Sequence, residues 1–259
     1  MGQSPHGDPV SGELDGPQRE ALRSGEISTV FERLTAPLTG AQLRLLHIYA
    51  ERLLEQGRRA GLTSAADRGR IHTRHFAESL ALLAALEAAG VLQSPVVDIG
   101  TGAGFPGLPM KIARPELELV LVEATGKKAR FLQALVEELG LERVTVLQGR
   151  AEELARESAN RDHFPLAVAR AVAPLPVLLE LALPFVAPGG YLAAPKGSAA
   201  PREVREAANA LAELRGEIVS AERLELGDAP PQTLVLVRKT AATPDRYPRR
   251  TGIPNKRPL

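Results

Sequence analysis

The chain has 259 residues, of which 44% are hydrophobic, so it is long enough to bury a substantial core. It contains no cysteine, which excludes disulfides, thiolate zinc sites and cysteine nucleophiles. The net charge is only +1, so any face that binds nucleic acid must come from local clusters of basic residues.

Residues 1–17 lack the apolar core of a signal peptide, which predicts a disordered N-terminal tail. The chain has no run of about 18 apolar residues, so we expect no membrane partner. A cytoplasmic location is therefore the default expectation.

Residues 18–90 predict a helical N-terminal extension. Apolar residues recur at helical spacing in two segments, which predicts one helix over residues 40–57 and a second over residues 70–89. The apolar residues are Leu43, Leu46, Tyr49, Leu53 and Leu54 in the first segment, and Phe76, Leu80, Leu83 and Leu86 in the second.

From residue 95 onward, strand and helix patterns alternate. Strands are expected over residues 95–99, 118–123, 143–148, 166–170 and 190–195. Helices are expected over residues 106–113, 126–139, 150–158, 175–186 and 201–215. This alternation predicts an α/β fold whose parallel sheet is covered by helices on both faces.

The pattern changes near the C-terminus, where two strands, over residues 217–226 and 233–239, follow each other without a helix. This closing hairpin must place one antiparallel strand in the sheet, which gives a mostly parallel, doubly wound sheet of seven strands. That arrangement is typical of the methyltransferase version of the doubly wound fold and not of the dehydrogenase version. We expect this domain to span residues 91–240, followed by an extended basic tail over residues 241–259.

A glycine-rich segment follows the first strand of the alternating pattern. Asp98 precedes Gly100, Gly102 and Gly104 in a D-x-G-x-G-x-G sequence. Glycines let the backbone turn sharply and touch a ligand, and a strand that leads through such a turn into a helix forms a nucleotide-type pocket. A carboxylate at Asp98 suits a ligand that presents a cation. The pattern resembles the first motif of class I S-adenosylmethionine (SAM) methyltransferases, whose cofactor carries an amino group and a sulfonium.

Glu123 ends the second strand, about 20 residues beyond the glycine turn. At this spacing an acidic residue can accept hydrogen bonds from both ribose hydroxyls of an adenosyl group. The alternative is a solvated glycine loop with a chance glutamate at a strand end. The strand, the glycines, the helix and the second acid follow one another at the spacing expected for a nucleoside cofactor, which favours that interpretation.

The segment around the end of the fourth strand, residues 167–174, limits which chemical groups the protein could methylate. It lacks the N/D-P-P-Y/F motif of amino-directed nucleic-acid methylases, and without cysteine the chain cannot form the adduct needed to methylate C5 of a pyrimidine. The remaining acceptors are those that are nucleophilic without a base or a covalent adduct. Guanine N7 is one of them, because it has a free lone pair and no proton to lose. Catalysis would then depend mainly on positioning N7 against the methyl group. Carboxylate, hydroxyl and other acceptors stay open.

Further motifs extend the resemblance to a particular family. They are RHFAESL at 74–80, DIGTGAGFPGLP at 98–109, EATGKKARFL at 123–132, GRAEEL at 149–154, ARAVAPL at 169–175, PKG at 195–197 and YPRRTGIPNKRPL at 247–259. From about residue 58 to its end, the chain resembles the RsmG (GidB) family of bacterial enzymes that methylate N7 of a guanine in the 530 loop of 16S ribosomal RNA. Three positions depart from the common family pattern: Gly61, Glu78 and Gln232.

The resemblance implies SAM as cofactor, 16S ribosomal RNA or the small ribosomal subunit as partner, and no metal. It places these residues around the cofactor: Asp98, Gly100, Gly102, Phe105, Glu123, Ala124, Thr125, Ala151, Glu152 and Arg170. Arg170 is also the expected catalytic residue, beside cofactor and target base at the mouth of the fourth strand, although a structural ion pair is an alternative. His72 and His75 have no third ligand nearby in sequence, so we do not expect them to bind a metal.

Local clusters of basic residues predict the RNA-binding face. Residues 58–75 carry five arginines against one acid, which indicates a phosphate-binding surface. Residues 246–259 are basic, without acids and stiffened by proline, and we expect them to lie along a phosphate backbone. The residues expected to contact RNA are Arg58, Arg59, Arg70, Arg74, His75, Lys127, Lys128, Lys196, Arg249 and Arg250.

Three other functions stay open on the residues alone. The chain could methylate a small molecule or a protein, or it could bind RNA without catalysis through a vestigial cofactor fold. An NAD-dependent oxidoreductase is the third alternative, and Asp98 and the closing hairpin argue against it.

Overall fold

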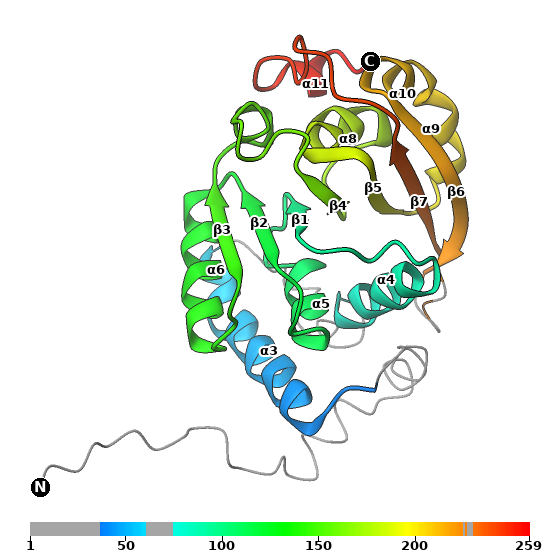
Figure 1. The fold of residues 1–259 in the computed structure, drawn as a ribbon. Coiled ribbons are helices and arrows are strands. Elements are labelled where there is room, and N and C mark those ends of the chain that lie inside the picture. The colour runs from blue at the N-terminus through cyan, green and yellow to red at the C-terminus, as the bar shows by residue number, and fades with distance from the viewer. Residues whose placement is uncertain (1–36, 61–74, 225, 227–229) are drawn as a thin grey trace, which may run out of the picture.

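The computed structural model of the chain describes residues 37–60, 75–224, 226 and 230–259, with the side chains of residues 57–60 excepted (Figure 1). The predicted disordered tail at residues 1–17 lies outside these residues. So do Arg70 and Arg74 of the expected RNA-binding face and the first residues of the second expected helix.

A seven-stranded sheet forms the centre of the molecule, in the order β3-β2-β1-β4-β5-β7-β6. The strands are β1 Val96–Ile99, β2 Leu119–Glu123, β3 Val144–Gln148, β4 Phe164–Val168, β5 Val186–Lys196, β6 Gly216–Leu224 and β7 Gln232–Lys239. Strands β1 to β5 pair in parallel, whereas β7 runs antiparallel to both β5 and β6. The predicted doubly wound sheet with its closing antiparallel hairpin is confirmed.

Helices cover both faces of this sheet (Figure 1). They are α3 Gly40–Ala60, α4 Ala77–Ala88, α5 Gly107–Ala113, α6 Gly126–Glu138, α7 Ala151–Leu154, α8 Leu175–Ala182, α9 Ala200–Glu206, α10 Ala208–Leu214 and α11 Ile253–Lys256, with a short 3-10 helix η3 at Leu183–Phe185. The apolar residues of α3 to α6 form one core cluster, and those of α8 and α10 belong to the other. The helix expected over residues 201–215 is divided into α9 and α10.

Helices α3 and α4 of the N-terminal extension pack into the same core as the sheet. Tyr49 of α3 and Phe76, just before α4, are fully buried, and their rings lie 5.2 Å apart. Tyr49 also stacks on Phe105, which follows the glycine turn, at 5.3 Å. Because of these contacts, the extension supports the loop that follows β1.

The C-terminal segment is docked on the protein, so our expectation of an extended tail is wrong. Tyr247 is buried in the core cluster of α8 and α10, and α11 packs on α8 (Figure 1). Arg161 donates to the backbone carbonyls of Tyr247, at 2.9 Å, and Thr243, at 2.8 Å. The tail lacks a hydrophobic period, but its arginines and backbone N–H groups donate to acids on the helices beneath it, and its carbonyls accept hydrogen bonds from Arg156 and Arg161.

Candidate functional site

The glycine turn after β1 has a backbone that side chains would disturb. Gly100, Gly102 and Gly104 have φ values of 66°, 62° and 105°, in the left-handed region that favours glycine. A Cβ on Gly104 would lie only 2.6 Å from the Tyr49 hydroxyl. Tyr49 donates that hydroxyl to the carbonyl of Ala103 at 2.6 Å, so the N-terminal extension holds the turn directly.

Asp98 lies fully buried in β1, directly beneath this turn. Its Oδ2 accepts hydrogen bonds from the Thr101 hydroxyl at 2.6 Å and the Gly107 backbone N–H at 2.9 Å. Its Oδ1 is buried and has no hydrogen-bond partner among the described residues. Burial raises the pKa of Asp98 to about 6, although the two hydrogen bonds oppose the shift. An orphaned carboxylate oxygen of this kind fits a cationic ligand group.

Glu123 at the end of β2 joins the glycine turn to the next loop. Its Oε2 accepts from the Gly102 backbone N–H at 3.0 Å, and its Oε1 accepts from the Thr125 backbone N–H at 2.7 Å. Each carboxylate oxygen has a second lone pair, so both oxygens can still accept from ribose hydroxyls. Ala124 and Thr125 are exposed beside it.

Ala151 and Glu152 begin α7, immediately after β3. Glu152 is buried, and its Oε1 accepts a hydrogen bond from the backbone N–H of Gly252 at 2.9 Å. One expected adenine contact is therefore held in place by the docked C-terminal segment. The sequence offered no signal for this long-range contact.

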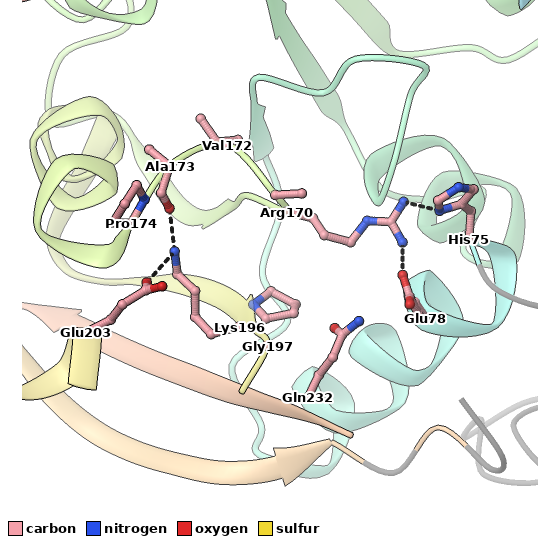
Figure 2. A pocket seen from close by; sticks show the side chains of 12 residues that line it. His75, Glu78, Arg170, Val172, Ala173, Pro174, Lys196, Gly197, Glu203 and Gln232 are labelled. Atoms are coloured by element: carbon pink, nitrogen blue, oxygen red, sulfur yellow. Dashed lines mark hydrogen bonds and ion pairs between the residues drawn. The ribbon is translucent and has the colours of Figure 1, made fainter. Parts of the chain in front are cut away.

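Arg170 follows β4 and reaches toward the N-terminal extension (Figure 2). Its guanidinium forms an ion pair with Glu78, lies 3.0 Å from His75 Nδ1 and covers the ring of Phe105 at 5.2 Å. The residue thus makes the structural ion pair considered above and also lines a cavity. Glu78 was noted in the sequence only as a departure from the family pattern.

The cavity beside β4 and β5 has a volume of about 510 Å³. It is lined by His75, Glu78, Arg170, Ala171, Val172, Ala173, Pro174, Pro195, Lys196, Gly197, Glu203 and Gln232 (Figure 2). Lys196 donates to the carbonyl of Ala173 at 2.5 Å and pairs with Glu203 at 3.1 Å. Glu203 also accepts from the Leu175 backbone N–H, at the start of α8. No motif in the sequence pointed to Glu203.

Val172 separates this cavity from the glycine turn. It lines the cavity, and its Cγ2 lies only 2.9 Å from where a Cβ on Gly100 would stand. Ala171, just before it, has φ of 55°, a strained conformation that residues with a Cβ adopt rarely. The strained bend after β4 therefore brings the cavity and the glycine turn into adjacent positions.

The expected RNA-contacting residues are spread over several surfaces. Lys127 is exposed and Lys128 half-buried at the start of α6, and Arg250 is exposed. Arg249 does not present a free guanidinium, because it forms hydrogen bonds to both carboxylate oxygens of Glu180, at 2.9 Å to Oε1 and 2.5 Å to Oε2. The side chains of Arg58 and Arg59, in α3, lie outside the described residues, as Arg70 and Arg74 do.

A mostly parallel sheet with antiparallel β7, a glycine turn after β1 and an acid ending β2 together define a class I methyltransferase. Two solved structures have this fold at low identity. A SAM complex of a mutant of MtNAS matches with a TM-score of 0.53 and 15% identity, over 89% of this chain and 86% of that one. A putative O-methyltransferase from Klebsiella pneumoniae matches with a TM-score of 0.51 and 21% identity, over 74% of this chain and 90% of that one.

The chain belongs to the rRNA small subunit methyltransferase G family, whose sequence model matches residues 42–228. The relative from Desulfitobacterium hafniense, ribosomal RNA small subunit methyltransferase G, is 43% identical over 229 residues, which is 88% of this chain and 94% of that protein. The relative of the same name from Deinococcus deserti is 47% identical over 80% of this chain and 85% of that protein. The family resemblance drawn from the motifs is confirmed.

No helix within the described ranges is long and apolar enough to cross a membrane. The same residues contain no group of three or more His, Asp or Glu side chains that could hold a metal ion.

Proposed function

We propose that the protein transfers the methyl group of SAM to N7 of a guanine in the 530 loop of 16S ribosomal RNA, with the naked RNA or the small ribosomal subunit as its partner. The observation that carries the proposal is the adjacency of a nucleoside-type glycine turn, with the orphaned Oδ1 of Asp98, to a polar cavity large enough for a base. Relatives of high identity that are rRNA small subunit methyltransferases support the RNA substrate. Such a substrate also supports a cytoplasmic location.

The residues of the turn fit the cofactor chemically. SAM supplies an electrophilic methyl group on a sulfonium. Asp98 would accept a hydrogen bond from the cofactor's amino group, and Glu123 would accept hydrogen bonds from its ribose hydroxyls. Ala151 and Glu152 would face the adenine, and Gly100, Gly102 and Phe105 would shape the pocket between them.

The acceptor side needs little beyond positioning, because guanine N7 carries a lone pair and no proton. Orientation of two reactants alone can contribute several kcal/mol to catalysis. Arg170 is suited to this task, since Glu78, His75 and Phe105 hold its guanidinium still at the cavity wall. Lys127, Lys128 and Arg250 are suited to contact the surrounding phosphates.

The test is incubation of the purified protein with labelled SAM and with small ribosomal subunits, naked 16S rRNA or a metabolite extract. We expect label in the RNA, and nucleoside analysis should find 7-methylguanosine alone. In cells that lack the protein, the return of 7-methylguanosine to 16S rRNA when the protein is supplied again would support the assignment. A C5-methylpyrimidine, an N6-methyladenine or label confined to the metabolites would refute it.

A further inference from the structure

Lys196 ends β5 and points across the cavity toward the segment after β4 (Figure 2). Its Nζ donates to the carbonyl of Ala173 at 2.5 Å and pairs with Glu203 at 3.1 Å. A lysine ammonium carries three N–H donors, so these two contacts leave one. The described part of the chain gives that third donor no acceptor.

The surroundings of Lys196 favour a partner for this remaining donor. The side chain is only 9% exposed, and burial lowers its pKa, although Glu203 opposes the shift. Because Lys196 lines the cavity, its remaining donor can face the space that a ligand would enter. A ligand that places an acceptor there would accept this third hydrogen bond.

The position of Lys196 is close to where methyl transfer must occur. It lines the same cavity as Val172, which packs against Gly100 of the glycine turn. The other cation at the cavity wall, Arg170, is held by Glu78 and His75. Lys196 is held separately, by Ala173 and Glu203, and so offers a second donor group to a base that enters the cavity.

Guanine and adenine differ at the position next to N7. Guanine presents N7 and O6, two acceptors on one edge, whereas adenine presents N7 beside an N6 amine, which is a donor. When N7 faces the cofactor, the group at C6 lies beside it and inside the same cavity. A fixed donor at this point can form a hydrogen bond with O6 of guanine but not with the N6 amine of adenine, which is itself a donor.

We propose that Lys196 Nζ donates a hydrogen bond to O6 of the target guanine and thereby selects guanine over adenine. Glu203 and the Ala173 carbonyl hold the ammonium so that its third N–H faces the base. This assignment rests on the proposed function, because it requires a guanine whose N7 is methylated.

The experiment uses the full-length protein and two synthetic 530-loop RNAs, one with guanine and one with 2-aminopurine at the target position. 2-Aminopurine retains N7 but lacks O6. For Lys196→Met we expect kcat/KM on the guanine RNA to fall about 10- to 100-fold, the effect typical of one charge-assisted hydrogen bond. On the 2-aminopurine RNA, the variant and the wild type should be equally active. Any difference in N7 reactivity between the bases cancels, because each variant-to-wild-type ratio uses one RNA.

Arg202→Gln is the matched control. Arg202 lies on α9 beside Glu203, but it is 67% exposed and pairs with Glu206 on the surface. This variant should match the wild type on both RNAs. Titration with SAM should give the same affinity for Lys196→Met as for the wild type, which shows that the fold and the cofactor pocket are intact.

Equal losses on both RNAs would overturn the assignment, because Lys196 would then act on the backbone or on the fold. A loss of SAM affinity in Lys196→Met, or full activity on the guanine RNA, would overturn it as well. A wild-type protein that methylates guanine N7 neither in this RNA nor in small ribosomal subunits would instead refute the proposed function on which the assignment rests.

Discussion

At the scale of single residues, we expect Asp98 to make cofactor binding depend on pH. Burial, the largest influence, raises its pKa to about 6 despite hydrogen bonds from Thr101 and Gly107; Arg170 lowers this pKa, and Glu123 raises it. Below pH 6 the carboxyl group of the empty protein is therefore mostly protonated. A cationic ligand needs the carboxylate, so binding below that pH must first release a proton.

We therefore predict that SAM affinity is level between pH 6.5 and pH 7.5 and falls about tenfold at pH 5. Asp98→Asn should bind SAM weakly, with an affinity that no longer changes over this range. Isothermal titration at several pH values measures both. A wild-type affinity that stays constant down to pH 5 would contradict the role of Asp98.

Glu123 provides a second prediction at this scale. Its two oxygens accept backbone N–H groups from Gly102 and Thr125 and remain available to a ribose. Glu123→Ala should weaken SAM binding by about 1.5–3 kcal/mol, the usual contribution of hydrogen bonds to a charged group. Glu118→Ala, at an exposed position just before the start of β2, is the control and should bind SAM normally. Equal affinities in both variants would exclude Glu123 from the pocket.

At the scale of secondary-structure elements, the docking of the C-terminal segment depends on a nearly buried ion pair. Glu180 of α8 is 1% exposed and accepts hydrogen bonds from the Arg249 guanidinium and from the Arg249 backbone N–H. Removing one partner of a buried pair leaves a charge without compensation, at a cost of about 3–5 kcal/mol.

Arg249→Met should therefore lower the free energy of unfolding by about 3 kcal/mol, and a second substitution, Glu180→Gln, should recover much of that loss. Arg250→Met, at the exposed neighbouring position, should leave stability unchanged. Denaturant titration of the wild type, of these variants and of the single variant Glu180→Gln measures this. An additive double variant would show that the pair does not couple the segment to α8.

The same segment contacts Glu152, which we propose to face the cofactor, through a hydrogen bond from the backbone N–H of Gly252. We predict that deletion of residues 244–259 weakens SAM binding as well as RNA binding, because Glu152 loses the donor that orients it. Isothermal titration of the truncated protein measures the first effect. Unchanged SAM affinity would show that the segment serves stability or RNA binding alone.

At the scale of the whole molecule, the N-terminal extension and the sheet share one core. Leu46, Tyr49 and Leu53 of α3 are buried in the cluster that contains Leu121 of β2. We predict that a chain lacking residues 1–60 does not fold cooperatively, because this face of the core would be exposed. Circular dichroism during heating tests it, with deletion of residues 1–17 as the control. A cooperative transition near the full-length Tm would show that the domain is independent.

Much of this architecture could be predicted from local sequence. Alternating apolar runs and helical periods predicted the sheet and most of its helices, because period and length report burial directly. The glycine turn and the acids Asp98 and Glu123 were predicted as well. Their chemistry depends on backbone conformation and strand register, both of which short motifs encode.

Contacts between distant segments were decided only by the tertiary structure. Arg170 meets Glu78, Glu152 meets Gly252, and Arg249 meets Glu180 across separations of 92, 100 and 69 residues. The sequence of a basic, proline-rich tail does not by itself show whether the tail docks or extends. Docking depends on acids that other helices place beneath it. The motifs alone thus predicted the class of cofactor pocket, while the packing of the chain determined which acids pair with Arg170, Lys196 and Arg249.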